Sequence, residues 1–303
     1  MQSKNFELSH HEMGRKACNN AILITGNGRS GTTILGKIIH SMRNVEYVFE
    51  PPLLDSLLPL ISKMEENHFR LLFETYCFDE LLIGQITGRA FNFNRNDDSC
   101  INLTKAPDEI GHRMAVAWSR VKAVEAVRNS RLLIKFPGLT GFLADLRRLY
   151  PTMTFVVTQR EPNSVIQSVI RKNWYKNATL KKWLFFMPSQ TIDFLTPFWV
   201  APEDIDNWRQ WSELERAAYY YIRNTEGATD VEGTISVAYE RLVANPDKVV
   251  RELADQLGLE YGALTPQLIS DTRARSELAE DWVSRLPSDM RDKIRELSEQ
   301  NPG

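Results

Sequence analysis

A glycine-rich segment at residues 26–33, with the sequence GNGRSGTT, has the spacing of a loop that holds a phosphate group. It follows a short apolar run at 21–25, and apolar residues at helical spacing follow it over 32–41, so the order is strand, loop and helix. Backbone N–H groups in such a turn point inward, and the N-terminus of the next helix adds a partial positive charge. The segment therefore predicts an anion site, with a simple glycine turn as the alternative.

One position of this loop separates it from the loops of nucleoside triphosphatases. The spacing approximates G-x-x-x-x-G-K-[ST], but Thr32 stands where the lysine would be. That lysine contacts the β- and γ-phosphates, so its absence disfavours ATP or GTP chemistry. The basic residue of this loop is Arg29.

A second candidate anion site follows the apolar run 154–158. Arg160 would lie at the carboxyl end of that strand, which is the edge where open α/β sheets bind ligands. Ser168 lies eight residues further on, about two turns into an expected helix. An arginine and a hydroxyl can hold a phosphate through charge-assisted hydrogen bonds. The alternative is an arginine that pairs with Glu161 or another surface carboxylate.

The elements around these residues alternate along the chain. Strands are predicted at 21–25, 131–135, 154–158 and 234–238, and helices at 32–41, 140–149, 163–172 and 246–257. Such alternation implies βαβ units, and hence an α/β fold with a central parallel sheet flanked by helices. Two stretches do not fit, a largely helical one at about 53–128 and an aromatic-rich one at about 173–232. We interpret them as insertions that wall an acceptor site, with ordinary helical core as the alternative.

Composition sets further limits on function. The chain has 303 residues and a net charge of −2, which predicts no bulk attraction to nucleic acid or to anionic membranes. The polar residues 1–20 are interpreted as a loosely packed leader, and residues 21–303 as a single domain. The apolar stretches are shorter than the ~18–20 residues of a membrane helix, and the three cysteines match no zinc or redox spacing. We expect a cytoplasmic protein without a membrane span; the oligomeric state cannot be inferred.

The two anion motifs, taken together, resemble those of the sulfotransferases that use 3′-phosphoadenosine-5′-phosphosulfate (PAPS). In that family an [R/K]-S-G-T-T loop binds the 5′-phosphosulfate, and R-x-P with a serine eight residues after the arginine binds the 3′-phosphate. The resemblance implies the P-loop-like fold of that family. It also implies that PAPS is bound by Arg29, Ser30, Gly31, Thr32, Thr33, Arg160 and Ser168.

Two further segments resemble the family less closely. The segment VAYERL at 237–242 resembles a Y-E-x-L segment whose tyrosine, here Tyr239, lies near the adenine; a core-packing tyrosine is the alternative. Residues 275–282 have the outline R-x-x-x-x-x-D-W, which implies Arg275 as another ligand of the 3′-phosphate. The lysine and both glycines that cytosolic members carry in this segment are absent here.

Sulfuryl transfer to a hydroxyl needs a base within hydrogen-bond reach of the acceptor. Cytosolic members use a histidine in K-x-H-x-P, but the comparable segment 135–137 has none. Glu50, in the segment YVFEPP, resembles the F-E-P glutamate that is the base in many Golgi and bacterial carbohydrate sulfotransferases. The resemblance implies Glu50 as base, with Arg29 and Lys135 stabilising the leaving phosphate oxygen. An ion pair at a loop is the alternative for Glu50, and a strand-end lysine without a catalytic role is the alternative for Lys135.

The expected reaction uses no metal and releases adenosine 3′,5′-bisphosphate. Its acceptor is expected to be a hydroxyl of a carbohydrate or small molecule, with phenols and amines left open. Two other functions also stay open. A nucleotide-dependent small-molecule kinase on a P-loop scaffold would need the lysine that Thr32 replaces. A protein that binds a nucleotide without turnover would not need the base that Glu50 offers.

Overall fold

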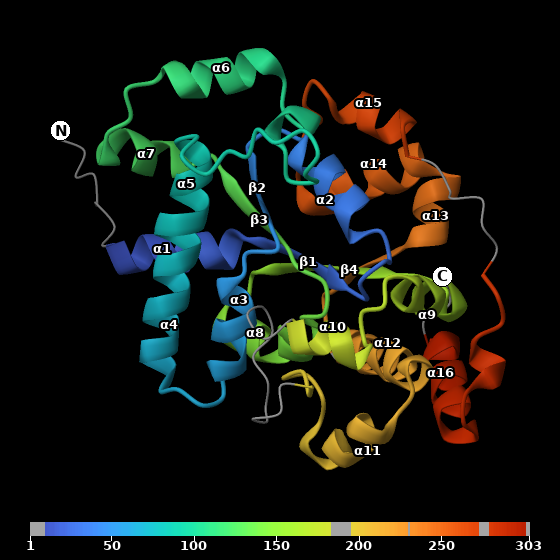
Figure 1. The fold of residues 1–303 in the computed structure, drawn as a ribbon. Coiled ribbons are helices and arrows are strands. Elements are labelled where there is room, and N and C mark those ends of the chain that lie inside the picture. Colours follow the sequence, from blue (N-terminus) through green and yellow to red (C-terminus); the bar gives the residue numbers. More distant parts are fainter. Residues whose placement is uncertain (1–9, 183–194, 230, 273–278, 301–303) are drawn as a thin grey trace.

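The computed structural model describes residues 10–182, 195–229, 231–272 and 279–300. Within these residues, five parallel strands form one sheet in the order β2-β3-β1-β4-β5 (Figure 1). The strands are β1 (Ile22–Gly26), β2 (Val45–Phe49), β3 (Arg131–Lys135), β4 (Thr154–Gln159) and β5 (Ile235–Ala238). The predicted α/β fold with a central parallel sheet is confirmed, and all carboxyl ends lie along one edge.

Strand β2 explains how the chain returns to the sheet after the phosphate loop. Helix α2 (Thr32–His40) follows the loop, and β2 then pairs with β3 rather than with β1. Glu50 directly follows β2, and its backbone N–H donates to the carbonyl oxygen of Lys135 at 2.8 Å. The strand order therefore places the ends of β2 and β3, and the two residues there, next to each other.

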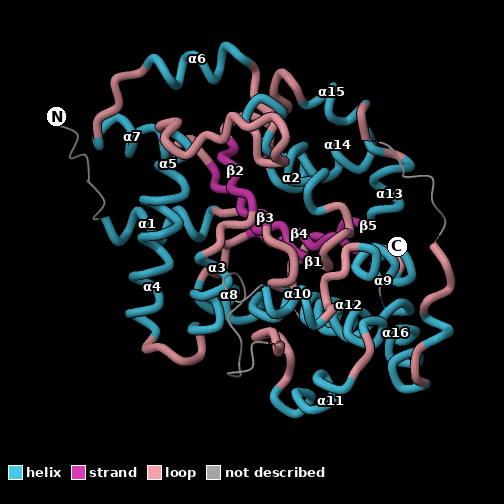
Figure 2. The backbone as a smooth tube through the Cα atoms, in the orientation of Figure 1, coloured by secondary structure: helices cyan, strands magenta, loops and turns pink. Residues whose placement is uncertain are grey.

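Helices cover both faces of the sheet, as Figure 2 shows. One face packs against α2, α14 (Pro246–Leu257) and α15 (Thr265–Ser270), and the other against α1 (His10–Asn20), α4 (Glu66–Thr75) and α8 (Leu143–Leu149). Successive strand residues alternate between faces, so Ile22 and Ile24 belong to one core cluster and Leu23 to the other. Burial on both faces is why these strands are continuous apolar runs in the sequence.

A third core cluster joins α9 (Pro162–Arg171), α12 (Glu213–Thr229) and α16 (Ser288–Gln300). The remaining helical elements are α3 (Leu53–Leu57), η1 (Leu58–Leu60), the π-helix η2 (Tyr76–Leu82), α5 (Ile83–Ile86), η3 (Ile101–Leu103), α6 (Pro107–Ala115), α7 (Arg120–Val127), η4 (Thr140–Phe142), α10 (Asn177–Lys182), η6 (Pro202–Asp204), α11 (Ile205–Gln210), α13 (Tyr239–Ala244) and η7 (Val283–Arg285).

The N-terminal segment differs from the loosely packed leader expected for residues 1–20. Residues 10–20 form α1, in which Ala17 and Cys18 are buried in the same cluster as Phe73 and Cys77. A short, mostly polar helix with a narrow apolar face gives little sequence signal, and this explains the difference. The division into a leader, one domain and two insertions stays a prediction.

No helix in the described ranges is long and apolar enough to cross a membrane. The cytoplasmic location stays a prediction.

Candidate active site

The predicted phosphate loop joins β1 to α2 and is held close to β4. Gly31 is the N-cap of α2 and has φ of 91°, and Arg29 also has a positive φ of 72°. At Gly26, where φ is 123°, a Cβ would lie 2.3 Å from the carbonyl oxygen of Thr158. Only glycine fits this approach. The loop thus wraps the N-terminus of α2, which is the arrangement that binds anions.

Two kinds of side chain occur in this loop. The buried Ser30 is engaged within the fold, because its hydroxyl donates to the carbonyl of Asn27 and lies 2.6 Å from the Thr158 hydroxyl. Thr32 and Thr33, in the first turn of α2, instead line a cavity. Of the predicted loop ligands, Ser30 therefore stabilises the loop conformation through its hydrogen bonds, whereas Thr32 and Thr33 border the cavity next to the loop.

The structure brings the two predicted anion sites together. Nε of Arg29 donates to Oγ of Ser168 at 3.0 Å, and Nη1 of Arg160 donates to the carbonyl oxygen of Arg29 at 2.8 Å. The Arg160 guanidinium lies 4.4 Å from the centre of the Tyr239 ring, and a Cβ on Gly31 would be 2.7 Å from the same ring. Tyr239 therefore packs against both sites.

One donor at this junction is available for an anion. Nε of Arg160 is buried and has no hydrogen-bond partner among the described residues. A buried N–H without an acceptor is costly unless a ligand supplies one. The residues present therefore fit a phosphorylated ligand that spans the loop and Arg160. Arg275, the other predicted ligand of the 3′-phosphate, lies outside the described residues.

Glu50 and Lys135 form an ion pair at the ends of β2 and β3. The Lys135 side chain is only 2% exposed, whereas that of Glu50 is 40% exposed. Burial lowers the pKa of Lys135, and the neighbouring Glu50 carboxylate partly offsets this effect. Nζ of Lys135 also lies 4.1 Å from the centre of the Phe49 ring. The pair matches the alternative stated for Glu50, but it leaves this carboxylate facing solvent-accessible space.

The phosphate loop, Glu50 and Lys135 border one cavity of about 420 Å³. Its walls carry five aromatic residues of the second predicted insertion, namely Trp174, Tyr175, Phe198, Trp199 and Tyr220. Part of the aromatic-rich stretch therefore reaches the candidate site. Trp208, in contrast, is buried in the core around α12, and Trp183, Phe185, Phe186 and Phe194 lie outside the described residues.

Several residues that line this cavity were not predicted as site residues, among them Asp55, Asp98 and Tyr220. Burial raises the pKa of Asp55 to about 7, and the nearby Glu50 adds to this effect. Asp98 pairs with Lys37 at 2.6 Å. Tyr220 accepts a hydrogen bond from the backbone N–H of Gly28 at 2.7 Å. No local motif marks these positions, because each reaches the cavity through tertiary packing alone.

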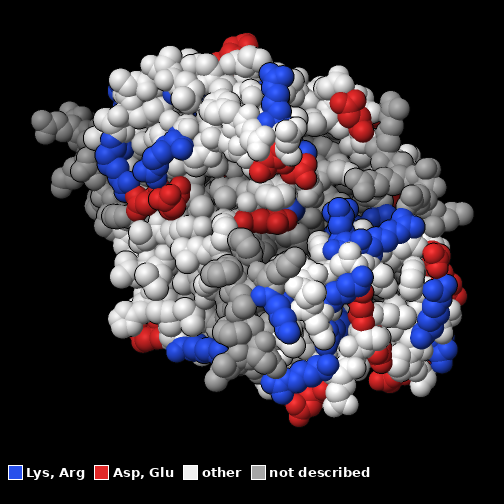
Figure 3. Space-filling view, viewed as in Figure 1, with Lys and Arg blue, Asp and Glu red and all other residues white. Residues whose placement is uncertain are grey.

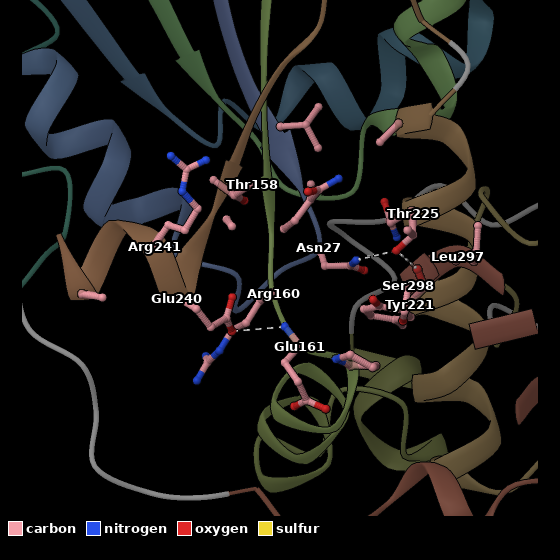
Figure 4. Close-up of a pocket in the computed structure, with 18 of the residues that line it drawn as sticks. Asn27, Thr158, Arg160, Glu161, Tyr221, Thr225, Glu240, Arg241, Leu297 and Ser298 are labelled. Atoms are coloured by element: carbon pink, nitrogen blue, oxygen red, sulfur yellow. Dashed lines mark hydrogen bonds between the residues drawn. The ribbon is translucent and has the colours of Figure 1, made fainter. Parts of the chain in front are cut away.

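A larger cavity, of about 540 Å³, is lined by Arg160 and by residues of α12 and α13. Figure 4 shows Asn27 bonded to Thr225 and the backbone of Glu161 bonded to Glu240 at its border. Arg160 lines this larger cavity, whereas Arg29, Glu50 and Lys135 line the smaller one, and Ser168 lines neither of the two. Because the predicted base and the loop arginine border the smaller cavity, we take it as the candidate active site. In the described part of the chain, no cluster of three His, Cys, Asp or Glu residues is arranged to bind a metal.

Charge is unevenly distributed over the surface of the molecule. On the face seen in Figure 3, basic side chains gather on the side of α9 and α13, and acidic side chains lie near the middle. A local basic group is therefore present although the net charge of the chain is −2. Such a group favours binding of an anion.

Comparison with known proteins shows the family of the chain. Residues 21–263 match the model of the sulfotransferase family, and the chain therefore belongs to this family. No curated protein matches the sequence.

Similar solved structures have low sequence identity to this chain, and three of them serve as examples. The sulfotransferase domain of the Synechococcus PCC 7002 olefin synthase is 14% identical, with 92% of this chain and 93% of that chain covered and a TM-score of 0.48. The sulfotransferase domain from the curacin biosynthetic pathway is 12% identical, with 93% and 96% covered and a TM-score of 0.49. A sulfotransferase from Alicyclobacillus acidocaldarius is 13% identical, with 92% and 94% covered and a TM-score of 0.44.

Proposed function

We propose that this protein transfers the sulfuryl group of PAPS to a hydroxyl of a carbohydrate or small-molecule acceptor. The observation that carries the proposal is the junction of Arg29, Arg160 and Ser168 beside the cavity that Glu50 borders. Membership of the sulfotransferase family supports the type of reaction. The aromatic walls of the cavity would suit a ring-shaped acceptor.

The 5′-phosphosulfate would be held by residues 29–33 and the 3′-phosphate by Arg160 and Ser168. PAPS, when bound, supplies the sulfuryl group and a bisphosphate leaving group. The N–H groups of the loop and Arg29 would stabilise the negative charge that develops on the leaving oxygen. Lys135 forms an ion pair with Glu50. Its ammonium group could therefore contact both the Glu50 carboxylate and a phosphosulfate bound on the loop. Tyr239 packs against the loop and Arg160, which supports a position near the nucleotide.

Glu50 would act as the general base of the transfer. Its carboxylate faces the cavity and would take the proton of the acceptor hydroxyl as that oxygen attacks the sulfur in line. The bond between sulfur and the phosphate oxygen breaks as the bond to the acceptor oxygen forms. This arrangement requires no covalent intermediate on the enzyme, and the product is adenosine 3′,5′-bisphosphate.

The test is calorimetric titration with adenosine 3′,5′-bisphosphate, compared with ATP and magnesium. We expect micromolar binding of the bisphosphate, weak binding of ATP, and a loss of about 10- to 100-fold in bisphosphate affinity for Arg160→Ala. Arg241→Ala is the matched control, because Arg241 is exposed, pairs with Glu252 and lines the larger cavity but not the smaller one. Tight ATP binding with indifference to the bisphosphate would contradict the proposal and favour a kinase. Bisphosphate binding without product from any acceptor would favour a binding protein.

A further inference from the structure

Three consecutive tyrosines of α12, Tyr219, Tyr220 and Tyr221, place their hydroxyls in different surroundings. The Tyr219 hydroxyl accepts a hydrogen bond from the N–H of Ala201 at 3.1 Å and donates one to Asp204 at 2.7 Å. Tyr221 borders the larger cavity (Figure 4). Of the three, Tyr220 lines the smaller cavity, where we place the reaction.

The Tyr220 hydroxyl has an unused hydrogen. Its oxygen accepts the N–H of Gly28 at 2.7 Å, and this is a loop residue directly before Arg29. A phenol hydroxyl also carries one hydrogen that it can donate. Among the described residues, none accepts it. Burial raises the pKa of Tyr220, although the bond from Gly28 lowers it somewhat, so the phenol keeps its hydrogen at neutral pH.

Packing fixes the position of this hydroxyl. Tyr220 is 5% exposed, and its ring contacts the rings of Trp174, Tyr175 and Trp199 at centroid distances of 5.4 to 6.3 Å. The hydroxyl lies between the segments that follow β1 and β3, because a Cβ added to Gly138 would be 3.8 Å from it. It therefore sits between the phosphate loop and the end of the strand that carries Lys135. A rigid, buried donor of this kind is preorganised for a ligand.

We propose that Tyr220 is a further catalytic residue, whose hydroxyl donates a hydrogen bond to an oxygen of the sulfuryl group. The inference rests on the proposed function, because it requires the phosphosulfate to lie on the loop. A sulfuryl group that extends from residues 29–33 towards Glu50 would lie in the cavity that Tyr220 also lines, on the side of the loop where its hydroxyl is bonded to Gly28. The contact holds the sulfur in line between the leaving oxygen and the acceptor oxygen. The acceptor proton goes to Glu50, and Tyr220 keeps its own proton throughout.

The test compares two ligands that differ in the sulfuryl group, PAPS and adenosine 3′,5′-bisphosphate, by calorimetry on the full chain. For Tyr220→Phe we expect a loss of about tenfold or more in PAPS affinity, since a hydrogen bond to a charged group disappears. Bisphosphate affinity should change by less than about twofold, since that ligand has no sulfuryl group to accept the bond. Tyr221→Phe, the adjacent residue on the same helix, is the matched control and should change neither affinity.

Other outcomes overturn the inference. Equal losses for both ligands would mean that Tyr220 only supports the loop through Gly28, and unchanged affinities would mean that it contacts neither ligand. If the wild-type protein binds neither ligand, the proposed function fails and this inference fails with it. If Tyr220→Phe does not fold, NMR of wild-type protein with ¹³C-labelled tyrosine phenol carbons replaces it. The Tyr220 signal should then shift with PAPS and not with the bisphosphate, and equal shifts would contradict the proposal.

Discussion

At the scale of single residues, Glu50 would have two roles in the proposed reaction, as the ion-pair partner of Lys135 and as the general base. Glu50 neutralises the buried ammonium of Lys135, yet its carboxylate is partly exposed to the cavity. A negatively charged donor on the neighbouring loop would give Lys135 a second anionic partner and compete with that ion pair. Under the proposed function, the same carboxylate would pair with lysine in the free protein and serve as base once the donor is bound.

Glu50→Gln tests this dual role. The amide keeps the shape of the side chain but cannot take the acceptor proton, so we expect kcat to fall by about 10²- to 10⁴-fold. Affinity for adenosine 3′,5′-bisphosphate should change little, because in the proposed site the loop and Arg160 would hold that ligand. Steady-state rates with an acceptor found by screening, and calorimetry on the same preparation, measure the two effects. An unchanged kcat would contradict the role of Glu50 as base and would mean that it only forms the ion pair with Lys135.

Asp55 gives a pH-dependent prediction for stability. Its pKa is raised from the usual 3.8 to about 7 by burial, with a contribution from Glu50. The folded protein thus binds a proton that the unfolded chain releases between these values, and stability is lost as pH rises through this window. We expect Asp55→Asn to raise Tm relative to wild type more at pH 8 than at pH 4. A difference in Tm that does not grow with pH would show that Asp55 ionises as an ordinary surface carboxylate does.

At the scale of elements, the junction of β1, the loop and α2 depends on close approach between glycine and aromatic side chains. Gly31 has a positive φ of 91°, and a Cβ there would be 2.7 Å from the Tyr239 ring. Tyr239 in turn lies beneath the guanidinium of Arg160. A side chain at position 31 would therefore push the aromatic ring and the arginine together out of place.

Gly31→Ala should lower bisphosphate affinity by more than about tenfold, because it displaces Tyr239 and Arg160 and loses their charge-assisted contacts. Gly258→Ala is the matched control, since it also has a positive φ, of 63°, but no heavy atom within 4 Å of the added Cβ. Both should lose about 1 kcal/mol of stability from backbone strain. Calorimetry and urea denaturation measure the two effects. Equal affinities in the two variants would show that Tyr239 moves without disturbing the site.

The elements that the sequence predicted best are those set by local patterns. Strand β3 and helix α14 occur at the predicted residues, because a buried parallel strand is a continuous apolar run and Pro246 marks a helix start. The pairing of β2 with β3 is not local, so the contact between Glu50 and Lys135 could not be derived from spacing. Tyr220 could not be distinguished from its two tyrosine neighbours, because only packing decides which hydroxyl meets the loop.

At the scale of the whole molecule, the helical stretch between β2 and β3 is tied to the edge of the sheet by buried charges. Glu46 of β2, with a side chain 2% exposed, pairs with Arg113 of α6 at 2.5 Å. Arg113 also contacts Glu109 at 2.8 Å, and Glu109 pairs with the buried Lys105 at 3.4 Å. Lys105 donates to the carbonyl oxygen of Met42 at 3.0 Å. The network thus fixes α6 to β2, the strand that Glu50 directly follows.

Arg113→Met should destabilise the fold, because it leaves the Glu46 carboxylate buried without its main partner. Breaking a buried pair in this way costs about 3–5 kcal/mol, and we expect the lower end because Lys105 also interacts with Glu46. Urea denaturation measures the change. Arg120→Met is the control, since the Arg120 side chain is 52% exposed and its pair with Asp79 should contribute less than about 1 kcal/mol. The double variant Glu46→Gln with Arg113→Met should recover most of the lost free energy of unfolding, because it removes the buried, unpaired charge of Glu46. If the double variant is as unstable as Arg113→Met, the loss in free energy of unfolding comes from lost packing of the aliphatic part of the arginine side chain and not from the unpaired Glu46 carboxylate.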